Sequence, residues 1–314
     1  MLSLIIPIYK NAANVPALLE ALDKLHDDLN GALEVVLVVD GSPDESYLLL
    51  REALPLKRYR SSLIALSRNF GSFSAIRAGL EAAHGERIAV MAADLQEPPE
   101  LVLEFDRRLR QGDVDVVIGQ RTARADPMLS RFYSRIFWGM YRRWVQRDLP
   151  PGGVDIFGCT DKVRRELVRL TEVNSSLVGL LFWIGFRRSF VPYVRRSRTA
   201  GRSAWTFSRK LRYLTDSMFA FSDLPVQMLL LIGMLGLAIS AAYASVVVVA
   251  KLVFSITPPG YAATVVLVSF FGGLNCFGLG VLGGYLWRTF ENSKQRPAYI
   301  VLSMESFNEQ SGHS

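Results

Sequence analysis

The N-terminal part of the chain alternates short apolar runs with segments whose apolar residues recur at helical spacing. The alternation of strands and helices is typical of βαβ units, so we expect an α/β domain with a mostly parallel sheet. The apolar runs predict strands at Leu2–Ile8, Glu34–Val39, Ser62–Leu66, Arg87–Ala92 and Asp115–Gly119. The segments between them predict helices at Val15–Leu25, Glu45–Ala53, Ser72–Ala83 and Pro99–Gln111.

Two much longer apolar runs follow in the C-terminal part of the chain. No residue from Leu224 to Ala250 carries a formal charge, and neither does any residue from Leu252 to Trp287. A helix needs about 20 apolar residues to cross a bilayer, and both runs exceed that length. We therefore predict two transmembrane helices, at about 226–249 and 263–287, joined by a short loop at Thr257–Gly260. The alternative, a pair of buried core helices, fits less well because both runs are long and uniformly apolar.

The basic residues beside these runs predict their orientation. Cations precede the first run and follow the second, whereas the connecting loop offers only Lys251. Lysine and arginine are enriched in cytoplasmic loops, so we expect a multi-pass protein of the cytoplasmic membrane with both termini in the cytoplasm. The apolar run Leu2–Tyr9 is too short for a signal peptide and lacks a basic flank. The flanking cations are Arg209, Lys210 and Arg212 before the first run, and Arg288, Lys294 and Arg296 after the second.

Composition and charge narrow the classes of protein that fit. The 314 residues carry a formal net charge of +7, half of them are hydrophobic, and the mean hydropathy is +0.21, which excludes a disordered chain. The two cysteines, Cys159 and Cys276, lie in regions of different composition, which excludes a disulfide scaffold. With three histidines in the sequence, a His/Cys metal cluster is excluded as well, so any metal must bind oxygen ligands.

Polar side chains follow the predicted strands at the points where the strands end. The carboxyl ends of parallel strands meet at one edge of a sheet, where such folds bind ligands, so we expect a functional site there. The alternative to a functional site is a purely structural role, with Asp40-Gly41-Ser42 as an ordinary turn and Ser72 as a helix cap. The sequence has neither a Gly-x-Gly-x-x-Gly nor a Walker-type loop, which argues against a dinucleotide enzyme or a P-loop ATPase. The strand-end residues are Tyr9, Asp40, Arg68, Asp94, Gln96 and Arg121.

The region before the first long apolar run is rich in arginine. Apolar residues from Leu129 to Trp144, and again from Phe207 to Phe221, recur at helical spacing and predict two amphipathic helices. The first is either a core-facing helix or a helix in the membrane interface, and we favour the interface because a membrane is already required nearby. Nine cations and no acidic residue lie between Glu172 and Asp216, which predicts contact with anionic lipid headgroups or a lipid phosphate rather than with nucleic acid.

Seven stretches of the sequence together point to one family. They are LSLIIPIYKN, VVLVVDGSPDES, LSRNFGSFSAIRAGLEAAHG, MAADLQEPPELV, IGQR, RTAGRSAW and GGYLWRTFENSKQRPAYIV. In this order they resemble the family 2 glycosyltransferases of GT-A fold, and specifically the polyisoprenyl-phosphate glycosyltransferases. That group includes dolichyl-phosphate mannose synthase and bacterial enzymes that load undecaprenyl phosphate with a sugar. The resemblance implies a Rossmann-like cytoplasmic GT-A domain at 1–223, with interfacial amphipathic helices at about 129–146 and 205–222, a two-helix transmembrane hairpin at 224–289, and a cytoplasmic tail at 290–314.

The resemblance also implies a reaction and its donor site. The chain would transfer a sugar, with inversion at the anomeric carbon, from a nucleotide-sugar to a polyprenyl phosphate, with undecaprenyl phosphate the expected carrier. Asp94 and Gln96 match the metal-binding part of the family's motif and would bind Mg²⁺ or Mn²⁺, while Arg121 matches an arginine near the phosphates. The nucleotide would be held by Pro7, Tyr9, Asp40 and Arg68.

On the acceptor side, Asp155 matches an aspartate that orients or deprotonates the acceptor. Together with Asp94 and Arg121 it makes up the catalytic set that the resemblance implies. The expected partners are the two substrates and membrane lipids, with no nucleic acid and with a homo-oligomer such as a tetramer. The residues expected to bind the acceptor phosphate are Arg131, Arg135, Arg198 and Ser203.

Three positions depart from the family's pattern. Ala92 stands where the metal motif has its first aspartate, and Gly158 stands where an arginine often occurs. Lys10-Asn11-Ala12-Ala13 replaces a run with two glutamates, so that carboxylates are missing near both the metal and the nucleoside. Ala92 and the altered Lys10–Ala13 run motivate an alternative function, a catalytically impaired relative that acts as a membrane scaffold or as the partner of a flippase.

Overall fold

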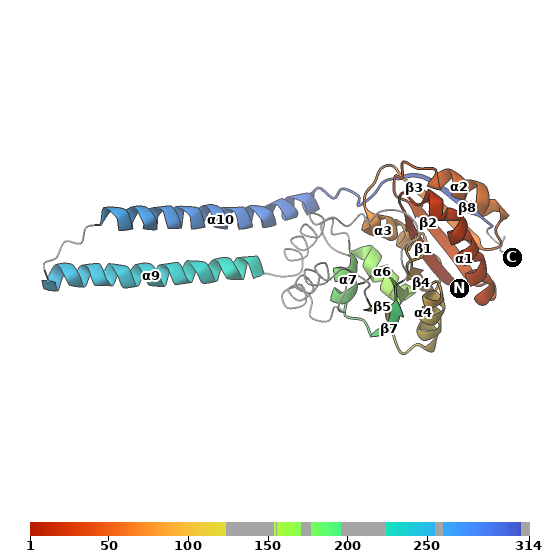
Figure 1. The fold of residues 1–314 in the computed structure, drawn as a ribbon, viewed down its shortest axis with the longest axis horizontal. Helices are drawn as coiled ribbons and strands as arrows, with labels where there is room; N and C mark the ends of the chain where they lie inside the picture. Colours follow the sequence, from red (N-terminus) through yellow and green to blue (C-terminus); the bar gives the residue numbers. More distant parts are fainter. Residues whose placement is uncertain (124–153, 155, 171–176, 196–223, 255–259, 309–314) are drawn as a thin grey trace. The chain divides into compact units, whose positions relative to one another are not determined.

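The structure is a computed structural model that describes residues 1–123, 154, 156–170, 177–195, 224–254 and 260–308. The chain divides into two compact units (Figure 1). The first unit comprises Met1–Leu211 and Pro297–Ser314, and the second comprises Arg212–Arg296. The amphipathic helices predicted at 129–146 and 205–222 lie outside the described residues.

One eight-stranded sheet organises the first unit, with the strand order β7-β5-β6-β4-β1-β2-β3-β8 (Figure 1). The four central strands β4, β1, β2 and β3 run parallel, and β5 and β7 are parallel to each other. β6 is antiparallel to both of its neighbours, and β8 is antiparallel to β3. The strands are β1 Leu2–Ile8, β2 Leu33–Val39, β3 Arg60–Leu66, β4 Arg87–Val90, β5 Val116–Ala123, β6 Phe157–Thr160, β7 Arg188–Val194 and β8 Val301–Phe307.

The central strands are largely apolar because both faces of the sheet are covered, and their polar residues, such as Ser3, Glu34 and Arg87, lie near the strand starts. Leu4 and Ile6 of β1 belong to a buried cluster with Leu18 of α1, whereas Ile5, on the opposite face, lies against Gly79 of α3. All five predicted strands and all four predicted helices are confirmed, with ends that shift by a few residues. The helices of this unit are α1 Val15–Asp28, α2 Ser46–Ala53, α3 Ser72–Ala82, α4 Glu100–Gln111, α6 Asp161–Arg169 and α7 Leu177–Trp183, with short 3-10 turns at Ala12–Asn14 and Leu54–Leu56.

The C-terminal tail contains a strand that we did not predict. β8 pairs with β3 from Ser61↔Phe307 to Leu66↔Val301 and closes that edge of the sheet. Tyr47 of α2 binds to β8. The Tyr47 hydroxyl donates a hydrogen bond to Glu305 Oε1 at 2.6 Å and lies 3.1 Å from Ser303 Oγ. The tail is therefore part of the first unit's sheet.

Two long helices make up the described part of the second unit, α9 Leu224–Phe254 and α10 Tyr261–Ser293. By length and composition each is able to cross a membrane, over Pro225–Tyr243 with a mean hydropathy of 1.9 and over Phe270–Ser293 with 1.2. Only 6% and 11% of these two windows are buried. Helices of a soluble core bury most of their apolar side chains, so this exposure is unlike that of the core-helix alternative.

Candidate active site

The loops that follow β1 and β2 are joined by one carboxylate, that of Asp44. Its Oδ2 accepts a hydrogen bond from the Ala12 amide at 2.9 Å, and its Oδ1 accepts from the hydroxyls of Ser42 and Ser46 at 2.6 and 2.7 Å. Ser42 Oγ in turn accepts from the Lys10 amide at 2.8 Å. Burial raises the pKa of Asp44, but these hydrogen bonds outweigh burial and hold that pKa below its usual value. Asp44 is therefore a structural anchor of the edge where we predicted a site.

A second anchor, Asp40, lies at the end of β2 and is 2% exposed. Its Oδ1 accepts a hydrogen bond from the Phe70 amide at 2.7 Å, and its Oδ2 accepts from the Gly71 amide at 2.8 Å. Burial raises the pKa of Asp40, although the two amides and the charge of Arg68 act in the opposite direction. Asp40 thus fixes the loop that leads from β3 into α3, and its contact with a nucleotide stays a prediction.

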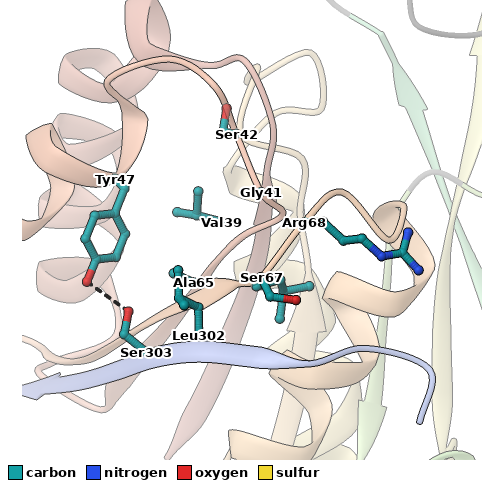
Figure 2. Close-up of a pocket in the computed structure, with 10 residues that line it drawn as sticks. Val39, Gly41, Ser42, Tyr47, Ala65, Ser67, Arg68, Leu302 and Ser303 are labelled. Carbon is teal, nitrogen blue, oxygen red and sulfur yellow. Dashed lines mark hydrogen bonds between the residues drawn. The ribbon is translucent and has the colours of Figure 1, made fainter. Parts of the chain in front are cut away.

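The loops after β2 and β3 approach each other so closely that only glycine fits at position 41. Gly41 has a φ of +54°, and a Cβ added there would lie 2.2 Å from the carbonyl carbon of Arg68 and 2.5 Å from the amide nitrogen of Asn69. In the same loop, the Arg68 guanidinium lies over the Phe70 ring, with its Cζ 4.1 Å from the ring centroid. Arg68 is exposed, and Figure 2 shows its guanidinium pointing away from Tyr47 and Ser303.

A pocket of about 360 Å³ lies between the ends of β2 and β3 and strand β8 (Figure 2). Of the four residues predicted to hold a nucleotide, the structure places Arg68 in the lining and leaves Pro7, Tyr9 and Asp40 outside it. The lining residues are Val39, Gly41, Ser42, Tyr47, Ala65, Leu66, Ser67, Arg68, Leu302 and Ser303.

The end of β1 presents Tyr9, which is 38% exposed, and the half-buried Pro7. Lys10 has a φ of 55°, and its Nζ lies 5.4 Å from the centroid of the Tyr9 ring. The Tyr9 carbonyl accepts a hydrogen bond from Asn11 Nδ2 at 3.1 Å. The turn after β1 therefore leaves an aromatic face and a cation accessible at the carboxyl edge.

Asp94 and Gln96 lie together in a tight turn after β4. Leu95 between them has a φ of 52°, and the Gln96 amide donates a hydrogen bond to Asp94 Oδ1 at 3.4 Å. Among the described residues no group of three or more His, Cys, Asp or Glu side chains could hold a metal. Carboxylate and amide oxygens are ligands that Mg²⁺ and Mn²⁺ accept, so the chemistry of Asp94 and Gln96 is compatible with either ion when substrate phosphates and water complete the shell. That these two residues bind a metal stays a prediction, and Ala92 contributes no ligand.

Glu97, next in the turn, was missed in the sequence analysis. Its side chain is 0% exposed, and its Oε1 lies 3.4 Å from Nε of Arg195, directly after β7. Burial raises the pKa of Glu97, the charge of Arg195 opposes the rise, and the charge of Asp94 adds to it. Arg121 at the end of β5 pairs in register with Tyr193 of β7 and belongs to the same cluster. The only sequence signal was a carboxylate before Pro98-Pro99, inside a stretch already quoted for the resemblance.

The acceptor-side residues cannot be placed in this geometry. Asp155 lies outside the described residues, and so do Arg131, Arg135, Arg198 and Ser203. Their roles stay predictions. The structure thus brings Asp94, Gln96 and Arg121 to the same edge of the sheet as the loops after β1, β2 and β3.

Comparison with known proteins shows the family of the chain. The family described as Glycosyl transferase family 2 matches residues 3–169. An uncharacterized glycosyltransferase of Synechocystis is 32% identical over 96% of this chain and 94% of its own length. The putative glycosyltransferase CsbB of Bacillus subtilis is 33% identical over 96% of this chain and 91% of its own. The bactoprenol glucosyl transferase of Shigella phage SfV is 28% identical over 96% and 97%. The chain therefore belongs to glycosyltransferase family 2, and its first unit has a GT-A-like fold.

Proposed function

We propose that this chain transfers a sugar from a nucleotide-sugar to a polyisoprenyl phosphate, with inversion, at the cytoplasmic face of the membrane. The observation that carries the proposal is the extent of the similarity to the bactoprenol glucosyl transferase of phage SfV. It covers 96% of this chain, and so extends beyond the glycosyltransferase domain to the two long apolar helices. A lipid-linked acceptor explains why both parts occur in one protein.

On the donor side, the turn after β4 is the place for the diphosphate. Asp94 and Gln96 would hold Mg²⁺ or Mn²⁺, whose charge stabilises the leaving nucleoside diphosphate. Arg121, on the neighbouring part of the same edge, would bind the phosphates. The nucleotide would be held by Tyr9, which is accessible after β1, by the half-buried Pro7 near the end of β1, and by Asp40 and Arg68. Asp40 also holds the β3–α3 loop through its two hydrogen bonds.

On the acceptor side, positioning is the main requirement. A phosphate monoester has its second pKa at about 6 and is already an anion at neutral pH, so it scarcely needs a general base. One of its oxygens bonds to the anomeric carbon while the bond from that carbon to the diphosphate oxygen breaks, which inverts the centre. Asp155 would orient the acceptor. The acceptor phosphate would be bound by Arg131, Arg135, Arg198 and Ser203.

The membrane unit would place this reaction at the cytoplasmic leaflet. We propose that α9 and α10 form a hairpin with both chain termini in the cytoplasm. Arg288 lies towards the end of α10, and Lys294 and Arg296 follow it, whereas Lys251 is the one cation at the far end of α9. This asymmetry fits the preference of cytoplasmic flanks for basic residues.

The alternative is a catalytically impaired relative that acts as a membrane scaffold or flippase partner, and Ala92 favours it. A nucleotide-release assay distinguishes the two. The full chain in detergent, with Mn²⁺ or Mg²⁺ and undecaprenyl phosphate, is screened against UDP-, GDP- and dTDP-sugars. Release that requires both lipid and metal, and that Asp94→Asn abolishes, supports the transferase.

The matched control is Asp113→Asn, which changes an exposed carboxylate that precedes β5 and lies away from the carboxyl edge. This variant should release nucleotide as the unsubstituted chain does. Silence of the unsubstituted chain across the panel, beside an active relative of known donor, would overturn the proposal and favour the scaffold.

A further inference from the structure

A buried cluster of opposite charges joins three elements at the carboxyl edge of the sheet. Glu97 comes from the turn after β4, Arg121 from the end of β5, and Arg195 from the residue after β7. Arg121 was predicted to lie near the phosphates, and Arg195 was one of the nine cations predicted to contact anionic lipid, whereas Glu97 had no predicted role. Glu97 is 0% exposed, whereas the Arg195 side chain is 31% exposed, so the carboxylate lies within the edge and the arginine remains partly accessible.

The contacts of Glu97 differ from those of an ordinary buried ion pair in the same unit. Asp106 of α4, 3% exposed, receives charged hydrogen bonds at 2.7 Å from Arg87 Nε and at 2.6 Å from Arg110 Nε. Among the described residues neither oxygen of Glu97 accepts a hydrogen bond, and the Arg195 guanidinium lies 3.4 Å away. A buried carboxylate needs compensation by charge, and here that charge comes from Arg195 with a further contribution from Arg121.

The surroundings show that the cluster is built into the sheet. Arg121 and Tyr193 are register partners on the adjacent parallel strands β5 and β7. A Cβ added to Gly119 would lie 2.4 Å from Ile156 Cγ2 and 3.2 Å from Tyr193 Cε1, so the absence of a side chain there makes room for the Tyr193 ring. Tyr193 is 6% exposed, and its burial fixes the end of β7 directly before Arg195.

Glu97 is also tied to the turn that holds the predicted metal ligands. It follows Gln96 directly, and the next residues, Pro98 and Pro99, restrict the backbone on its C-terminal side before α4 begins. The Glu97 carboxylate is therefore fixed relative to Asp94 by a short and stiff piece of chain. A guanidinium held by this carboxylate is fixed relative to Asp94 as well.

We infer that Glu97 is a positioning residue that holds the Arg195 guanidinium beside the Asp94–Gln96 turn, where it adds to Arg121 a second positive charge for a diphosphate. This inference rests on the proposed function for the identity of the diphosphate, that of a nucleotide-sugar. Glu97 itself does not touch the diphosphate. It acts through Arg195, and a diphosphate bound with a divalent cation carries the negative charge that two arginines complement.

The test measures binding of inorganic pyrophosphate to the protein by calorimetry. The full chain in detergent, with Mn²⁺ present, is titrated with pyrophosphate. Glu97→Gln keeps the size of the side chain and removes its charge, and Arg195→Gln removes the partner. We expect each variant to weaken pyrophosphate binding about 10- to 100-fold, the loss that supporting residues of such sites show. The double variant should bind pyrophosphate with about the affinity of the single variant that binds it less tightly, because the two residues act as one unit. Arg195→Lys, which keeps the charge, should recover part of the affinity.

Asp106→Asn is the matched control, since it breaks a carboxylate pair of similar burial on α4. It should lower the melting temperature and leave pyrophosphate affinity unchanged. Unchanged affinity in Glu97→Gln, or an equal loss in Asp106→Asn, would overturn the inference, and so would no binding to the unsubstituted chain. The nucleotide-release assay reports separately on the proposed function. With an active donor in hand, Glu97→Gln should raise the donor KM and leave the polyprenyl phosphate KM unchanged, whereas a general loss of structure would change both.

Discussion

Replacing Gly41 with alanine tests how tightly the loops after β2 and β3 are fitted together. The new Cβ would lie 2.2 Å from the carbonyl carbon of Arg68, far inside any van der Waals contact. The atoms it meets are backbone, and Asp40 holds the same loop by accepting hydrogen bonds from the following Phe70 and Gly71 amides. The left-handed φ of +54° adds about 1 to 2 kcal/mol of strain for any residue with a side chain. Relief of the clash adds about 1 to 3 kcal/mol.

The chain offers a control that carries the strain without the clash. Gly112, at the C-terminal end of α4, has a φ of +77° and no atom within 4 Å of an added Cβ. Gly112→Ala should therefore show only the strain of about 1 to 2 kcal/mol. The difference between the two variants isolates the clash, and it corresponds to a melting temperature roughly 2 to 12 °C lower for Gly41→Ala than for Gly112→Ala.

The assay is thermal unfolding of the full chain in detergent, followed by near-ultraviolet circular dichroism. Nucleotide release is then measured at a temperature where both variants are folded. We expect Gly41→Ala to lose release because its β3–α3 loop has moved, and Gly112→Ala to retain it. Equal melting temperatures for the two variants would show that the loops separate without cost, and would refute the role assigned to this contact.

Three further changes have definite expected outcomes. Asp94→Asn should lower nucleotide release about 100-fold or more at an unchanged melting temperature. A chelator should lower release from the unsubstituted chain to the same extent. Added Mn²⁺ should then restore release from the unsubstituted chain and not from Asp94→Asn. Tyr47→Phe removes the hydroxyl contacts to β8 and should cost about 1 to 2 kcal/mol in the free energy of unfolding, seen in a denaturant titration. Burial raises the pKa of Glu34, but hydrogen bonds from Ser3 and His84 outweigh burial and hold that pKa below its usual value. The Glu34 carboxylate therefore stabilises the folded chain fully above the unfolded pKa of about 4.3, and this stabilisation is lost as the pH falls through the lower folded pKa. Glu34→Gln should therefore be less stable than the unsubstituted chain at pH 6 and closer to it at pH 3, and an equal deficit at both would contradict the linkage.

The elements that the sequence predicted well are those whose patterns are decided locally. The strands β1 to β4 are largely apolar runs because both faces of the sheet are covered, and the helices between them keep the 3.6-residue period. β8 could not be found in this way. Its residues alternate between exposed and half-buried positions, and it becomes a strand because the edge of β3 is there to pair with.

The candidate site shows the same difference between features decided by local sequence and features decided by contacts between distant residues. Asp94 and Gln96 are neighbours in sequence, so a motif was enough to place them together, and the structure confirms that they share one turn. The contact between Glu97 and Arg195 joins positions far apart in the chain, and no spacing rule reveals it. Asp40 was recognised as a strand-end residue, but its hydrogen bonds to the Phe70 and Gly71 amides depend on how two loops meet.

The position of β8 sets an order for biosynthesis. β3 is synthesised before both long helices, yet the strand that covers its edge follows them in the chain. During translation β3 therefore presents a row of unpaired amide and carbonyl groups until α9 and α10 have been synthesised, and such edges invite pairing with other chains. Removal of the C-terminal residues by a stop codon or by a protease would leave the edge of β3 permanently open. A soluble fragment cut before α9 would have the same defect, and it would need a separate copy of the β8 segment to complete its sheet.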